Sequence, residues 1–135
     1  MNIDEKWMKF AMDEAKLAMN EEEIPVGAVL IQNNKLIARS HNQPIKNNDP
    51  TAHAEIQLLR KAGVQQKNYR LIGSTIYVTL EPCTMCFGAM IHARIERIVF
   101  GASDFKTGVC GSCINLNKEN FFNHKISITG GVLEN

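Results

Sequence analysis

Apolar residues near the start of the chain recur with the period of an α-helix. Within residues 4–20 they fall roughly every 3.6 positions, with lysines and acidic residues between them. The apolar positions are Trp7, Met8, Ala11, Ala15, Ala18 and Met19. This spacing predicts one amphipathic helix over residues 4–20.

After Pro25 the pattern changes to short apolar runs of strand length. The run "VGAVLIQ" is followed by "NNK", which favours a turn, and then by "LIARS", so the two runs predict a β-hairpin. Three later segments also have the composition of strands: "TIYVTLE" from Thr75, "RIVFGA" from Arg97 and "KISIT" from Lys125.

Two further helices are expected between these strands. An acid and a proline precede Thr51, which predicts a second helix over residues 51–62, ended by Gly63. A short third helix follows Pro82. Helices that alternate with strands predict an α/β sheet covered on both faces, in a single domain spanning residues 1–135.

Composition narrows the class of protein. The chain is 44% hydrophobic and 21% charged, and it has no apolar run near the roughly eighteen residues of a membrane span. The first ten residues lack a secretory signal, so we predict a cytoplasmic protein. The net charge of +1 gives no sign of the broad basic surface that non-specific nucleic-acid binders use, so any nucleic-acid partner must be bound locally.

The cysteines form two pairs with the same spacing, Cys83 with Cys86 and Cys110 with Cys113. Because thiols stay reduced in the cytoplasm, such pairs favour metal binding or catalysis over disulfides. For the second pair, in "GVCGSC", we expect two small reduced side chains in a loop, with a redox pair or a second metal site as the alternative.

His53, Cys83 and Cys86 supply the three protein ligands that a catalytic zinc typically takes. The two cysteines open the third predicted helix, where their spacing puts both sulfurs on one face and the helix dipole favours thiolates. Glu55 lies two residues after His53, and in a first helical turn both side chains can reach past the helix end. We therefore expect zinc between the N-terminal ends of the second and third helices, with Glu55 beside the metal.

This donor set predicts hydrolytic deamination of an amidine-like ring carbon. Zinc can lower the pKa of a bound water to about 7, and Glu55 would take its proton and deliver it to the substrate. The CxxC pair and the histidine, each taken alone, have other interpretations. The CxxC pair is also compatible with a structural zinc half-site or a redox pair, and a lone histidine in a helix often caps or packs.

Taken together, "DPTAHAEI" and "TLEPCTMC" make the chain similar to the zinc-dependent cytidine/deoxycytidylate deaminase superfamily, and within it to the tRNA adenosine deaminases. "EIPVGAVLI", "HNQPI" and "VFGASDFKTG" extend this resemblance over nearly the whole chain. It implies a three-layer α/β/α fold with a central mixed sheet of about five strands. It also implies that zinc-bound hydroxide and Glu55 convert the wobble adenosine of a tRNA anticodon loop to inosine.

The resemblance assigns further residues to the substrate. Asn42 would hydrogen-bond the flipped base, since a carboxamide offers both a donor and an acceptor. It places the Ala54 backbone and three apolar side chains around the base, and two charged residues against the anticodon loop. The apolar residues are Ile24, Pro25 and Val26, and the charged ones are Asp104 and Lys106.

The family also implies a homodimer, which the residues themselves support only weakly. Phe87, Met90 and Ile91 would suit either a dimer surface or the core of one subunit. The family's C-terminal helix is expected to be missing from residues 1–135, which would remove RNA contacts.

Two other functions remain open at this level. The same chemistry would serve a deaminase of free nucleobases or nucleosides, such as cytosine or guanine. A non-catalytic, zinc-bearing partner subunit is the second alternative, but a structural site would have no use for Glu55.

Overall fold

The strands form a single mixed sheet in the computed structural model, which describes residues 1–119 and 122–134. The order across this five-stranded sheet is β2-β1-β3-β4-β5. The elements along the chain are α1 (Ile3–Asn20), β1 (Gly27–Gln32), β2 (Lys35–His41), α2 (Ala54–Gln66), β3 (Ser74–Leu80), α3 (Thr84–Ala93), β4 (Arg97–Ala102), the 3₁₀ helix η1 (Leu116–Lys118) and β5 (Ser127–Thr129).

The directions of the strands decide where polar side chains can gather. β1 runs antiparallel to both β2 and β3, whereas β3, β4 and β5 are parallel. The carboxyl ends of β3 and β4 therefore meet at one edge of the sheet, where the Glu81 N–H donates to the Ala102 carbonyl at 2.9 Å. Ligand sites in such sheets typically lie outside the carboxyl ends of the strands.

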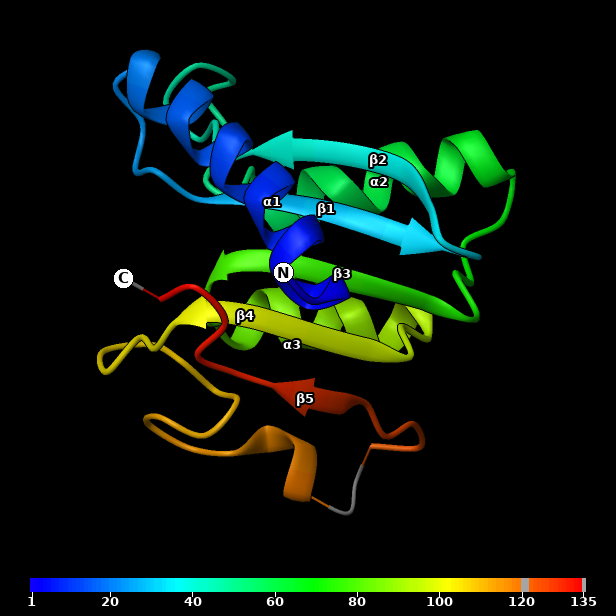
Figure 1. Cartoon of the computed structure of the whole chain (residues 1–135). Helices are drawn as coiled ribbons and strands as arrows, with labels where there is room; N and C mark the ends of the chain where they lie inside the picture. The colour runs from blue at the N-terminus through cyan, green and yellow to red at the C-terminus, as the bar shows by residue number, and fades with distance from the viewer. Residues whose placement is uncertain (120–121, 135) are drawn as a thin grey trace.

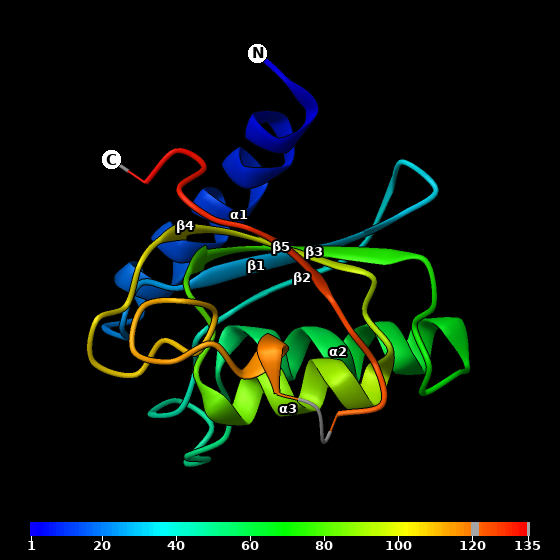
Figure 2. The same cartoon turned by 90° about the horizontal axis from the view of Figure 1, so that it is seen from below.

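Helices cover both faces of the sheet, which confirms the three-layer α/β/α fold. α1 packs on one face, and α2 and α3 lie side by side on the other (Figures 1 and 2). Alternate residues of β1 serve the two layers: Val29 and Ile31 join the α1 cluster, and Ala28 and Leu30 face α2 and α3. This is the period-2 burial expected of a strand covered on both sides.

The second helix differs from its prediction at both ends. It begins at Ala54 because the Asp49 carboxylate accepts hydrogen bonds from the N–H and hydroxyl of Thr51 at 2.9 and 2.7 Å, which holds that stretch in a turn. It continues through Gly63 to Gln66 and ends where Lys67 takes a left-handed conformation with φ 53°. Ending the helix at Gly63 was therefore wrong.

The first helix is tied to β2 by charge as well as by apolar packing. Met19 is 59% exposed, contrary to its predicted place on the buried face, whereas Glu14 is buried. The Glu14 carboxylate accepts from the Arg39 guanidinium at 2.7 Å and lies 3.0 Å from the His41 ring.

Within the described residues, none of the helices combines the length and apolar character needed to cross a bilayer.

Candidate metal centre and substrate pocket

Two helix N-termini carry the three predicted ligands. His53 is the N-cap residue of α2, Cys83 is the N-cap residue of α3, and Cys86 lies in the first turn of α3. The His53 side chain makes no hydrogen bond to the backbone of α2, and the N–H groups at the start of α3 face the Cys83 sulfur. Both side chains are thus left to face the space between the two helix ends, as the sequence predicted.

The two nitrogen–sulfur separations among the three donor atoms are those of a tetrahedral zinc site. The Nδ1 atom of His53 lies 3.7 Å from the Cys83 sulfur and 3.6 Å from the Cys86 sulfur, and all three atoms lie within 4.8 Å of one another. Zinc bonds of about 2.3 Å to sulfur and about 2.0 Å to nitrogen, at tetrahedral angles, require donor separations of roughly 3.5 to 3.8 Å. One imidazole and two sulfurs at these distances fit Zn²⁺.

The two cysteines differ in acidity. A hydrogen bond from the Cys86 thiol, helped by the N–H groups of Cys86 and Met85 at the helix start, lowers the pKa of Cys83 to about 5. The same thiol bond and burial raise the pKa of Cys86. The pair therefore shares one proton, which a bound cation would displace.

Glu55 lies beside the three donor atoms without belonging to their cluster. It follows the cap of α2 and is only 4% exposed. Burial raises its pKa to about 7, with a smaller contribution from nearby Cys83. A carboxyl group with a pKa near neutrality can both accept and return a proton, which suits general acid–base catalysis.

A cavity of about 180 Å³ opens next to this cluster. It brings together residues from five separate parts of the chain. Its walls are Ile24, Val26, Asn42, His53, Glu55, Leu80, Glu81, Cys83, Asp104 and Thr107. Most of the predicted site residues thus surround one space beside the donor atoms.

Four predicted residues lie outside the cavity lining. Ala54 and Cys86 are fully buried, and Pro25 is exposed. Lys106 borders a neighbouring hollow of about 410 Å³, which shares Cys83 and Thr107 with the first cavity. Lys106 can therefore meet only those parts of a ligand that extend beyond the cavity.

Asn42 is held at the cavity by the backbone on either side of it. Its N–H donates to the Val26 carbonyl at 3.0 Å, and the Gln43 N–H donates to the Ala52 carbonyl at 2.9 Å. The residue is only 7% exposed. Its carboxamide thus borders the cavity from a fixed backbone.

Asp104 uses its carboxylate within its own loop. One oxygen accepts from the N–H groups of Lys106 and Thr107 at 2.9 and 3.1 Å, and the other accepts from the Thr107 hydroxyl at 2.8 Å. The side chain therefore shapes the turn that carries Lys106.

Leu80, Glu81 and Thr107 also line the cavity, but the sequence had assigned them no role. For Glu81 a signal was present, since an acid at the end of an apolar strand and next to Pro-Cys needs buried partners. Leu80 and Thr107 offer no comparable signal.

The second cysteine pair contributes no ligand to the cluster. Cys110 is buried, which raises its pKa to about 12, and Cys113 is exposed with its thiol 3.0 Å from the Phe105 carbonyl. Both are free thiols, as the sequence led us to expect.

Comparison with known proteins identifies the class to which this fold and donor cluster belong. Residues 1–102 match the family described as the cytidine and deoxycytidylate deaminase zinc-binding region. The chain belongs to this family, which confirms the superfamily resemblance inferred from its motifs.

Proteins of similar sequence identify the branch of this family to which the chain belongs. A Haemophilus influenzae protein named tRNA-specific adenosine deaminase is 51% identical over 97% of this chain and 76% of its own length. A Bacillus subtilis protein of the same name is 46% identical over 99% of this chain and 83% of its own length. The chain is thus a member of the tRNA-specific adenosine deaminases within the wider class.

Solved structures with the same fold include a tRNA deaminase and a guanine deaminase. A structure from a study of tRNA:A34 deaminases superposes with a TM-score of 0.93 at 41% identity, covering 96% of this chain and 94% of the other. A guanine deaminase from Bacillus subtilis superposes with a TM-score of 0.72 at 36% identity, covering 76% of this chain and 66% of the other.

Proposed function

We propose that the protein hydrolyses the wobble adenosine of a tRNA anticodon loop to inosine and releases ammonia. The observation that carries this proposal is the joint geometry of the site. A His-Cys-Cys donor set of zinc dimensions and a buried glutamate share one small cavity with Asn42. In relatives named tRNA-specific adenosine deaminase, similarity extends over nearly the whole of this chain.

His53, Cys83 and Cys86 would hold the zinc. When bound, zinc lowers the pKa of a coordinated water and so supplies a nucleophile at neutral pH. Glu55 would accept one proton from the attacking water and deliver it to a ring nitrogen of adenine, and would then carry the second proton of that water to the departing amine. The amino group of the base is thereby exchanged for an oxygen, and water is consumed.

The size and lining of the cavity suit one base. Its volume of about 180 Å³ is below the roughly 300–1,000 Å³ typical of pockets for drug-sized ligands. The base would therefore enter alone, with the rest of the RNA outside. Anticodon-loop bases are already unpaired, so extruding one of them costs little. Asn42 would read its edge with a donor and an acceptor, and Ile24 and Val26 would contact its faces.

The test is to incubate the zinc-loaded protein with an unmodified tRNA that carries adenosine at the wobble position and to sequence the product. Inosine should form at that position, while a matched tRNA with guanosine there should stay unchanged. Absence of inosine at full zinc occupancy would contradict the proposal.

Free-base deamination is the second candidate, since the chain is 36% identical to the guanine deaminase over the superposed region. Ammonia released from guanine or cytosine, with tRNA unchanged, would establish this alternative.

A purely structural role is disfavoured because burying the Glu55 carboxylate beside the donor cluster costs free energy unless the carboxylate serves the chemistry.

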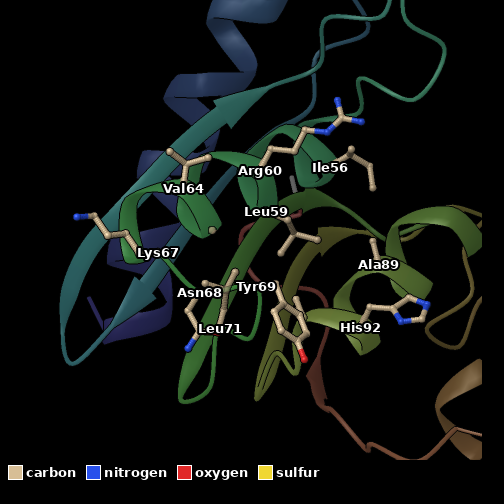
Figure 3. A pocket seen from close by; sticks show the side chains of 12 residues that line it. Ile56, Leu59, Arg60, Val64, Lys67, Asn68, Tyr69, Leu71, Ala89 and His92 are labelled. Carbon is tan, nitrogen blue, oxygen red and sulfur yellow. The ribbon is translucent and has the colours of Figure 1, made fainter.

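We further propose that two copies of the chain associate through a groove between α2 and α3, in agreement with the homodimers of the family. The α2–α3 groove has a volume of about 960 Å³ and is lined mainly by apolar side chains (Figure 3). These are Ile56, Leu59, Val64, Tyr69, Leu71 and Ala89. Val64 and Tyr69 are 79% and 73% exposed in the single chain, and such exposed apolar side chains support an interaction surface here.

The sequence analysis had left three residues of α3 as candidates for the dimer surface, and we propose the groove in their place. Phe87 and Met90 are fully buried and Ile91 is 6% exposed. All three belong to the core cluster of one subunit. They are therefore far less available to a partner than Val64 and Tyr69, the exposed side chains of the groove.

The Tyr69→Glu variant is expected to be monomeric at concentrations where the wild type is dimeric, because the variant would bury an unpaired charge in the interface. Sedimentation velocity measures the change. Met19→Glu is the matched control, since Met19 is also exposed but lies on α1, across the sheet from the groove. A dimeric Tyr69→Glu protein would exclude the groove as the interface.

A further inference from the structure

Glu81 is a second buried carboxylate at the cavity, and its surroundings differ from those of Glu55. It follows β3, precedes Cys83 by two residues, and is 3% exposed. Its backbone is fixed by the hydrogen bond to Ala102 at the carboxyl edge of the sheet.

Four donors surround the Glu81 carboxylate. One oxygen accepts from the Asp104 N–H at 3.1 Å and from the Ser112 hydroxyl. The other accepts from the N–H groups of Cys110 at 2.8 Å and Ser112 at 3.1 Å. Burial would raise the pKa of Glu81, but these hydrogen bonds outweigh burial and keep the pKa below its usual range. Both oxygens are occupied, so Glu81 is no second proton acceptor for a substrate.

All four donors come from one loop, residues 104–112, which follows β4. The loop packs closely around the carboxylate: a Cβ atom on Gly108 would lie 2.5 Å from the Glu81 carboxyl carbon and 2.5 Å from the Asp104 carbonyl. The Val109 N–H also donates to the Pro82 carbonyl at 3.1 Å. A loop that belongs to no helix or named strand is thus held against the end of β3 by one buried side chain.

This loop forms one wall of the cavity. Asp104 and Thr107 line the cavity itself, and Lys106, Thr107, Val109 and Cys113 border the neighbouring hollow. The opposite walls belong to α2, α3 and the segment around Asn42, which do not depend on Glu81 for their backbone hydrogen bonds. A change at Glu81 should therefore move only one side of the site.

We propose that Glu81 is a positioning residue, which holds the 104–112 loop against the cavity so that Asp104, Lys106 and Thr107 meet the substrate in a fixed arrangement. This inference rests on the proposed deaminase function for its kinetic part only. Glu81 acts on substrate binding through the loop, whereas the zinc ligands and Glu55 act on the chemical step.

The test is Glu81→Gln, which keeps the shape of the side chain but turns an NH₂ group toward at least one N–H donor. Hydrogen exchange should become about tenfold faster or more at the amides of Asp104, Cys110 and Ser112. The KM for an anticodon stem-loop should rise about tenfold while kcat falls less than about threefold. Zinc content should stay at the wild-type value. Glu96→Gln, an exposed acid at the opposite end of β4, is the matched control and should change none of these values.

Ser112→Ala supplies a second variant in case Glu81→Gln folds poorly. It removes one donor and should shift exchange and KM in the same direction by a smaller factor. Unchanged exchange in both variants, or faster exchange with unchanged KM, would overturn the proposal, as would loss of zinc from Glu81→Gln. Because hydrogen exchange needs no substrate, a wild type that leaves tRNA unchanged would refute the proposed function and still leave the anchoring of the loop measurable.

Discussion

Replacing Glu55 with alanine is expected to lower the turnover of tRNA adenosine by roughly a hundred- to ten-thousand-fold while the zinc content stays unchanged. The carboxylate lies outside the donor cluster, so its loss removes a proton carrier and no ligand. Glu55→Gln is the matched variant, since it keeps the volume of the side chain and cannot transfer the proton. Single-turnover kinetics and elemental analysis on the same preparations measure both quantities.

Stability should move in the opposite direction to activity. Glu55 is 4% exposed, and a buried carboxyl group costs free energy unless it is fully compensated. The Tm of Glu55→Gln should therefore equal or exceed that of the wild type, as at other sites that trade stability for function. Full activity in either variant would remove Glu55 from the mechanism, and loss of zinc would make it a ligand.

Replacing Cys83 or Cys86 with alanine should abolish zinc binding, and with it activity. Two remaining donors cannot form the three-ligand site that the 3.6 and 3.7 Å separations define around His53 Nδ1. The wild type should also lose thermal stability when a chelator removes its metal, because a ligand that binds only the folded state stabilises it. Both cysteine variants should be insensitive to the chelator.

Cys110→Ser is the control for these variants. Cys110 is a buried free thiol, but it is not one of the three donors. The serine variant should retain zinc, and any loss of stability should come from a hydroxyl placed in an apolar site. A Cys110→Ser protein without metal, or a Cys83→Ala protein with it, would mean that the donors had been misassigned.

The pattern of the sequence determined the architecture because each element carries its own local signal. The period of about 3.6 residues in α1 and the apolar run before "NNK" in the hairpin depend only on neighbours in the chain. The His-x-Glu and CxxC spacings likewise predicted a cluster at two helix starts, since both helices begin at or directly after these residues.

Local pattern was less informative where a side chain competes with the helix. The Asp49 carboxylate holds Thr51 in a turn, and His53 becomes a cap in place of an interior helical residue. Gly63, which was predicted to end the helix, lies inside it. The helix ends four residues later, where Lys67 adopts a left-handed conformation. Such choices depend on small energy differences between turn and helix, which periodicity does not measure.

The sequence by itself thus determined the mixed α/β fold, the donor set and the carboxylate beside it. Only the tertiary structure decided which residues close the cavity and which apolar side chains stay exposed. Glu81 meets its four donors from a loop more than twenty residues away, and Phe87 and Met90 are buried under packing that no local pattern reveals. Burial and loop shape arise from contacts distant in the chain, and these contacts exist only once the sheet and its two helical layers have formed.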